Sequence, residues 1–187
     1  MPHCSLNFRL TLKSSNIKAR ENEVLTVIKS IAKITQELSM IAIRTAKPSD
    51  IRQLVDLLKE LFTIEADFDF DPEKQSRGLN LLLGSEKDCI LVAELISDKK
   101  VLGMCTVQTL ISTAEGGPVG LLEDLVVAAD FRHQGIGAKL LAEAVNRAEC
   151  QGLKRLHLLA DKNNLPALNF YEKQGWESTQ LVCLRKL

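Results

Sequence analysis

The stretch that decides the fold is "ADFRHQGIGAKLLAEAV", residues 129–145. Two glycines, Gly135 and Gly137, flank one isoleucine at the start of an amphipathic run. Glycine in the first turn of a helix has a conformational cost, so the pattern indicates that the backbone here must be free of side chains. An apolar, strand-like segment at 119–128 precedes it. We therefore predict a strand, a glycine loop and a helix over residues 137–151.

The predicted loop has the features of an anion site. The first amides of a helix have no intrahelical partners and carry the positive end of its dipole. Gly135 and Gly137 let neighbouring amides converge, and Arg132, His133 and Lys139 add positive charge or hydrogen-bond donors. A phosphate or pyrophosphate is the natural ligand.

Other interpretations of the loop fit less well. A P-loop needs a different spacing, and Leu140 follows Lys139 where that motif needs Ser or Thr. The dinucleotide fingerprint needs a third glycine where Leu140 stands, although Asp161 after the next predicted strand is a partial point in its favour. A helix entry with two chance glycines is the remaining alternative.

The composition limits the function classes. The 187 residues are enough for one ordinary domain with a core. Lys plus Arg and Asp plus Glu both number 24, which argues against a dedicated nucleic-acid binder. No stretch approaches the roughly 18 apolar residues of a membrane span. The five cysteines are odd in number and lack metal-ligand spacing, so we expect a reducing, cytoplasmic location and no metal site.

The chain has two predicted parts, an N-terminal extension over residues 1–40 and a compact domain over 41–187. Residues 1–20 contain four basic residues and no acid, and we interpret them as a flexible extension rather than a targeting signal. Residues 21–39 have apolar residues at helical spacing, which predicts an amphipathic helix that docks on the domain or on a partner.

The domain has the predicted order β-α-α-β-β-β-α-β-α-β. The expected strands are 41–46, 89–96, 101–111, 119–128, 154–160 and one or two within 176–187; the expected helices are 47–62, 72–84, 137–151 and 164–175. Ser49 is the expected cap of the first helix. A strand–helix–strand unit over 119–160 implies a right-handed parallel crossover, and the earlier strands imply antiparallel pairs. The fold class is α/β with a mixed, mostly antiparallel central sheet.

Three segments in order resemble one family. "RHQGIGAKLL" resembles the R/Q-x-x-G-x-G/A signature of the GNAT acyltransferases, "LLEDLVVAADF" resembles their central strand and turn, and "NNLPALNFYEKQGW" resembles their N-x-x-A-x-x-F-Y-x-K-x-G-F/W segment. The resemblance covers about residues 41–187. It implies the acyl-CoA N-acyltransferase fold, with a splayed parallel pair of strands, and an N-acetyltransferase that uses acetyl-CoA.

The resemblance also implies where the coenzyme binds. The loop that would hold its pyrophosphate consists of Arg132, His133, Gln134, Gly135, Ile136, Gly137 and Ala138. The backbone of Leu125, Val126 and Val127 would pair with the pantetheine arm as an added strand does. Asn164 is a further partner for that arm, or alternatively the cap of the following helix.

Two side chains are the predicted catalytic residues. Tyr171 matches the family's frequent acid and would donate to the leaving sulfur; the alternative is an aromatic packed beside Phe170. Glu123 stands where the family often has an acid that deprotonates the amine, directly or through water. Asp124 is less favoured, and because consecutive strand residues point to opposite faces, we expect only one of the two acids in the cleft. A solvated strand acid is the alternative for both.

An acidic connector follows the first predicted helix. Glu65, Asp67, Asp69 and Asp71 would attract a cationic amine, or else form a solvated charge run. They do not form an EF-hand, because the required turn Gly and Glu would fall on Pro72 and Gly78.

We predict direct attack of a primary amine, carried by a small molecule or peptide, on acetyl-CoA in a ternary complex, because no cysteine stands in a matched catalytic position. The alternatives are a non-catalytic acyl-CoA sensor and a partner subunit. The acceptor and the oligomeric state, a homodimer included, stay open.

Overall fold

The computed structural model describes residues 20, 23–29, 40–65 and 68–186. It divides the chain into two units, Met1–Ile41 and Ala42–Leu187. In the first unit, residues 23–29 are helical. The rest of the helix predicted over 21–39, and residues 1–19 of the predicted extension, lie outside the described residues.

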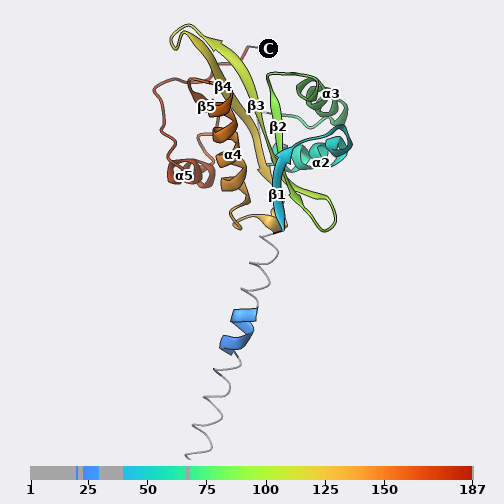
Figure 1. Ribbon diagram of the computed structural model, residues 1–187. Helices are drawn as coiled ribbons and strands as arrows, with labels where there is room; N and C mark the ends of the chain where they lie inside the picture. Colours follow the sequence, from blue (N-terminus) through green and yellow to red (C-terminus); the bar gives the residue numbers. More distant parts are fainter. Residues whose placement is uncertain (1–19, 21–22, 30–39, 66–67, 187) are drawn as a thin grey trace, which may run out of the picture. The chain divides into compact units, whose positions relative to one another are not determined.

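One five-stranded sheet runs in the order β1-β2-β3-β4-β5 (Figure 1). The strands are β1 (Ile41–Thr45), β2 (Cys89–Leu95), β3 (Lys100–Ser112), β4 (Gly117–Val127) and β5 (Leu156–Leu158). β2 and β4 both pair with β3 in antiparallel fashion, whereas β4 and β5 are parallel. The predicted mixed sheet is therefore confirmed.

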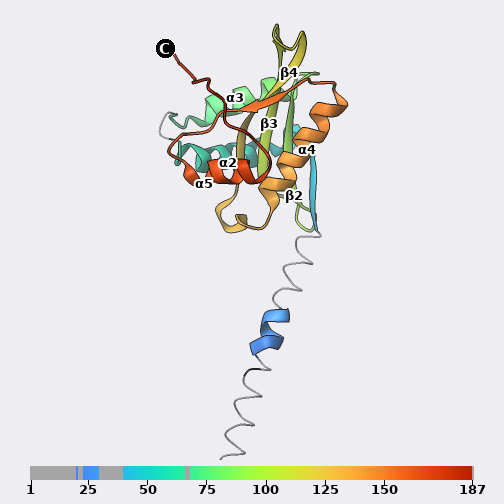
Figure 2. The same cartoon turned by 90° about the vertical axis from the view of Figure 1, so that its left-hand side faces the viewer.

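Two pairs of helices cover the two faces of the sheet, as Figures 1 and 2 show. α2 (Ile51–Phe62) and α3 (Pro72–Leu83) lie on one face, and α4 (Ile136–Cys150) and α5 (Leu165–Lys173) lie on the other. Leu54 and Leu58 of α2 pack with Ile90 and Met104 of the sheet. Leu140 of α4 is fully buried. The apolar spacing of α2 and α4 thus corresponds to the side that each of these helices buries.

The start of α2 differs from the prediction. Ser49 was the expected cap, but Pro48–Asp50 form a short 3-10 turn, and Asp50 accepts a hydrogen bond from the amide of Lys47 at 2.7 Å. Asp50 is 4% exposed and is paired with Arg44, which also binds Glu94 of β2. Although burial opposes it, the Arg44 guanidinium holds the pKa of Asp50 below its usual value. An ion pair across elements thus replaces the local cap.

The prediction of a strand at the C-terminal end is wrong. Residues 177–186 form no strand, so the order of regular elements in the described chain ends with α5. Leu181, Val182 and Leu184 are at least 80% exposed. Without a buried face, alternation alone does not fix a strand in register.

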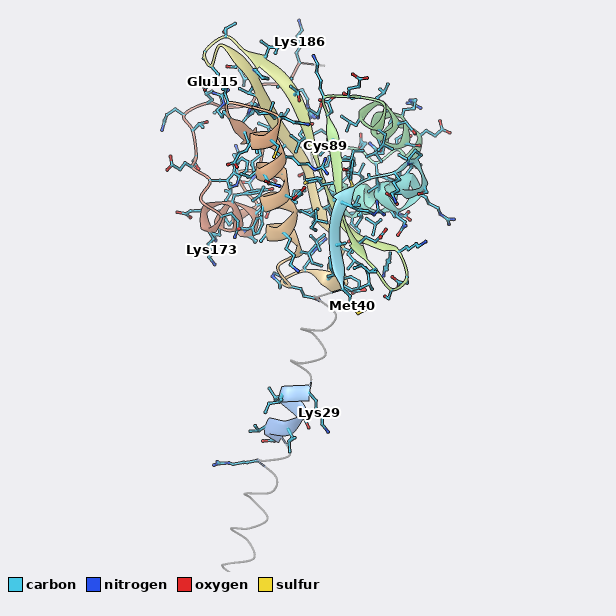
Figure 3. The ribbon with its side chains drawn as sticks, in the orientation of Figure 1. Lys29, Met40, Cys89, Glu115, Lys173 and Lys186 are labelled. Carbon is cyan, nitrogen blue, oxygen red and sulfur yellow. The ribbon has the colours of Figure 1, made fainter. Side chains whose placement is uncertain are left out.

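The parallel pair is short, and this creates the opening on which the site depends. β4 pairs with β5 only from Gly120–Leu156 to Leu122–Leu158, while β4 continues to Val127. The last part of β4 thus has β3 on one side and no strand partner on the other. At the opposite end, Glu115 in the β3–β4 turn (Figure 3) forms an ion pair with Arg155, just before β5, at 3.2 Å.

Candidate active site

The glycine loop presents backbone amides at the start of α4. Gly135 has φ +80° and His133 has φ +62°, so left-handed residues alternate with others in the way that forms an anion nest. The first helical bond runs from the Lys139 amide to the Gly135 carbonyl, at 3.1 Å. No side chain caps this helix. The amides of Ile136, Gly137 and Ala138 therefore lack intrahelical partners.

The other helix ends provide a contrast within the same chain. Asp71 caps α3 by accepting from the amides of Glu73 and Lys74. Asn164 caps α5, with Oδ1 3.1 Å from the amide of Ala167. The capping alternative for Asn164 is thus observed, and its coenzyme role stays a prediction. The start of α4, in contrast, keeps uncapped amides and the positive end of the helix dipole, and an anion would pair with both.

Arg132 is held by the protein at the entrance to the loop. Its Nε donates to the carbonyl of Val127 at 2.9 Å, and its Nη2 lies 3.5 Å from Glu60 Oε2 on α2. The same Glu60 oxygen accepts from the amide of Ala129 at 3.1 Å. Gln134 donates to the carbonyl of Asp130. These contacts fix the path of the chain between β4 and α4.

The end of β4 offers backbone groups to the opening beside β5. Ala128 donates its amide to the carbonyl of Leu102, so neighbouring β4 residues alternate between β3 and the open side. Val127 therefore points its N–H and C=O away from β3, and since Arg132 already binds the C=O, the N–H is the group that Val127 can offer. Val126 instead pairs with Met104 and buries its side chain in the core.

A bulge interrupts β4 at Asp124. Thr106 opposes Glu123 and Met104 opposes Val126, so two β4 residues face Cys105 alone. Asp124 has φ +53°, unusual for a residue with a side chain. Its Oδ2 lies 3.5 Å from the Thr106 hydroxyl, on the face that Glu123 also uses. The expectation that the two acids point to opposite faces is therefore wrong.

The two carboxylates have different surroundings. Glu123 accepts a 2.6 Å hydrogen bond from Gln108 Nε2. Asp124 is more enclosed: burial, followed by the charges of Glu123 and Glu65, raises its pKa to about 6. A carboxylate of this kind is a competent base near neutral pH.

Tyr171 is half-buried on α5, next to Phe170, whose ring lies against Gly137 at the start of α4. Its ring contacts Phe170 and Trp176, with centroids 5.3 and 6.3 Å away. Burial, followed by the charge of Glu65, raises its pKa to about 12, and the enclosed Cys105 thiol also interacts with it. Tyr171 therefore remains a neutral donor across the physiological range.

Of the acidic connector, Glu65 is the residue whose charge reaches both Tyr171 and Asp124. Asp71 is used as the helix cap, Asp69 is exposed, and Asp67 lies outside the described residues. Within the described ranges, no three His, Cys, Asp or Glu side chains gather closely enough to hold a metal ion.

Several participants have no local signal in the sequence. Glu60 is 72 positions from Arg132, and Gln108 is 15 from Glu123. His157 on β5, whose register partner is Leu121, buries Nδ1 without a hydrogen-bond partner. Only the topology brings each of these residues to its neighbour on or after β4.

Comparison with known proteins agrees with this geometry. The sequence model described as the acetyltransferase (GNAT) family matches residues 51–176. An uncharacterized N-acetyltransferase of Archaeoglobus fulgidus is 30% identical over 134 residues, covering 71% of this chain and 90% of that protein. The fold and the site define an acyltransferase. The chain belongs to the GNAT acetyltransferase family and is an acetyl-CoA-dependent N-acetyltransferase.

Solved structures share the fold. A transcriptional regulator from Bacillus halodurans has a TM-score of 0.70 at 24% identity, with 79% of this chain and 99% of that chain covered. A predicted acetyltransferase with acetyl-CoA from Clostridium acetobutylicum has a TM-score of 0.65 at 22% identity, with 78% and 96% covered. None of the helices in the described part of the chain has the length and hydropathy that a membrane crossing needs.

Proposed function

We propose that this chain transfers the acetyl group of acetyl-CoA to a primary amine by direct attack in a ternary complex. Three features support the proposal: the α4 amides have no side-chain cap, β4 continues past its pairing with β5, and the charge of Glu65 acts on both Tyr171 and Asp124. This arrangement provides an anion site, a donor and a base for one transfer reaction.

The coenzyme diphosphate binds at residues 132–138, through the amides of Ile136, Gly137 and Ala138. The pantetheine arm lies along Leu125 and Val127, with Asn164 as a further partner. Val127 N–H is the donor for the thioester carbonyl, where negative charge grows during attack. Burial of the Ile136 side chain, which is 1% exposed, keeps this loop in position.

Tyr171 donates to the leaving sulfur. With its pKa at about 12, complete transfer to a thiolate of pKa near 8.5 is uphill by roughly 5 kcal/mol. Tyr171 therefore stabilises the departing thiolate by a hydrogen bond, and proton delivery follows C–S cleavage. The enclosed Cys105 has a raised pKa from burial, which disfavours a covalent acetyl-cysteine route.

The acceptor is a cationic amine. Glu65, Glu123 and Asp124 place negative charge at the opening, which favours an ammonium group. Exchange of Glu65 for Gln raises the KM of a trication such as spermidine more than that of a monocation such as glucosamine. Equal effects on both acceptors contradict this assignment.

The decisive measurement of function is release of free thiol from acetyl-CoA with spermidine, glucosamine, lysine and a short peptide. We expect thiol release with at least one of these amines. Tight coenzyme binding in calorimetry without any release supports the alternative of a non-catalytic sensor. Trapping of an acetyl-cysteine excludes direct attack.

We also infer a cytoplasmic location. All four cysteines within the described residues are free, and Cys89 and Cys105 are buried, as expected in a reducing compartment.

A further inference from the structure

We propose that Asp124, rather than Glu123, accepts the proton of the acceptor ammonium, an inference that rests on the proposed acetyl transfer.

The backbone supports this assignment. In a regular strand Asp124 would point to the face opposite Glu123, where α4 packs. The bulge and the left-handed φ of +53° turn it toward Thr106 instead. A bulge often re-aims a side chain beside an active site, and strained residues gather where chemistry requires them.

The hydrogen bonds of the two acids also favour Asp124 as the base. One oxygen of Glu123 is engaged by Gln108 at 2.6 Å. Thr106 donates its hydroxyl to the Glu123 carbonyl at 3.1 Å, so its 3.5 Å contact with Asp124 is the weaker one. Asp124 thus keeps the more weakly bonded carboxylate of the pair.

Titratable groups from several elements act on Asp124. Glu123 lies beside it on β4, Glu65 follows α2, and Cys105 lies opposite on β3. Tyr171 of α5 interacts with the same Glu65 and Cys105. Burial and the two carboxylates raise the pKa of Asp124 to about 6, which suits a base at neutral pH.

The protons balance as follows. Asp124 takes one proton from the ammonium and releases it to solvent, and the free amine attacks the thioester carbonyl carbon. The new C–N bond forms as the C–S bond breaks and the electron pair goes to sulfur. Asp124, ionised again, takes the second proton from nitrogen and passes it to solvent, while sulfur takes a proton from Tyr171, which solvent then reprotonates. The products are the acetylated amine, coenzyme A and one proton.

The test compares Asp124→Asn with Glu123→Gln in the full chain. The probes are acetyl-CoA and whichever of spermidine, glucosamine, lysine and the short peptide gives the fastest thiol release. We measure kcat/KM for that amine from pH 5 to 9. Asn retains the shape of Asp and suits a positive φ, so the backbone is preserved.

We expect Asp124→Asn to lower kcat/KM for the amine by about 100-fold or more and to abolish the acidic limb near pH 6, while coenzyme affinity changes little. Glu123→Gln keeps that limb and displaces it to lower pH, because a neighbouring negative charge has been removed. If Asp124→Asn does not fold, the displacement in Glu123→Gln decides alone.

Retention of the limb in Asp124→Asn, or its loss in Glu123→Gln, overturns the inference while leaving acetyl transfer intact. Absence of thiol release from the wild type with all four amines overturns the proposed function, and this inference with it.

Discussion

At the scale of single residues, Gly135 and Gly137 meet different needs although they are two positions apart. Gly135 has φ +80°, which a side chain disfavours. A Cβ at Gly137 would lie 3.5 Å from Phe170 Cζ, an ordinary contact. The backbone therefore favours glycine at position 135, whereas at position 137 a Cβ would meet Phe170 and Val127 only at ordinary contact distances.

We predict that Gly135→Ala lowers the free energy of unfolding by about 1 kcal/mol, the cost of a left-handed residue with a Cβ. Gly137→Ala leaves stability close to the wild type but raises the Kd for coenzyme A several-fold. Thermal melting and calorimetry distinguish the two effects. Unchanged coenzyme affinity in Gly137→Ala contradicts the prediction.

Tyr171 allows a second prediction at this scale. Tyr171→Phe keeps the ring and removes the hydroxyl, so kcat falls by roughly 10- to 100-fold while the Kd for coenzyme A changes little. Because its pKa is about 12, Tyr171 is protonated throughout pH 6–9 and the loss is constant over that range. Trp176→Phe is the matched control for ring packing. Equal losses in turnover and coenzyme binding would indicate a packing role.

At the scale of elements, Glu60 connects α2 to the segment between β4 and α4. One oxygen contacts both the Ala129 amide and Arg132. Arg132 in turn holds the Val127 carbonyl. The α2 helix on one face of the sheet thus contacts the glycine loop that precedes α4 on the other face.

Glu60→Ala should therefore raise the KM for acetyl-CoA by about 3- to 10-fold with a smaller change in kcat, since an exposed pair contributes about 1 kcal/mol. Steady-state kinetics at fixed amine measure this split. Glu73→Ala, which removes a comparable surface pair with Arg77 on α3, is the control. An equal rise in KM for both variants contradicts a role for Glu60 in positioning the loop.

At the scale of the whole molecule, the periodic parts of the sequence were enough to predict most of the fold. Apolar spacing predicts α2 and α4 within a few residues, and Pro and Gly at the ends predict α3 and α5. The parallel β4–β5 pair follows from the crossover. The prediction fails where a tertiary contact decides, as in the Arg44–Asp50 pair that replaces the Ser49 cap. It also fails at the C-terminal end, where Leu181 and Val182 have no face to bury.

For the candidate site, too, the sequence predicts the parts with a local pattern and misses those that depend on tertiary contacts. Its loop and Tyr171 are found by local pattern, because glycines and a unique tyrosine are visible in one segment. The bulge is invisible, since "LLEDLVV" has the composition of an ordinary strand and nothing marks an extra residue. Glu60, Gln108 and Thr106 belong to other elements and join the site only through the topology.

Coenzyme binding should stabilise the entire domain. Coenzyme A at 100 times its Kd adds about 2.7 kcal/mol if it binds only the folded state. For a domain of this size the midpoint of thermal unfolding rises by roughly 5–10 °C. Adenosine, which lacks the diphosphate, should give a much smaller shift at the same concentration. Equal shifts for both ligands would argue against binding through the α4 amides.

At position 124 the left-handed backbone limits which residues allow folding, and the inferred proton transfer limits which residues allow activity. In a library of all twenty amino acids at this position, selection for folded protein retains Asn and Gly beside Asp, because these residues enter that region most readily. The inferred role of Asp124 as the base predicts that selection for thiol release from acetyl-CoA retains Asp alone. Comparison of the two selections would thus separate the residues that the backbone accepts from the residue that the reaction needs.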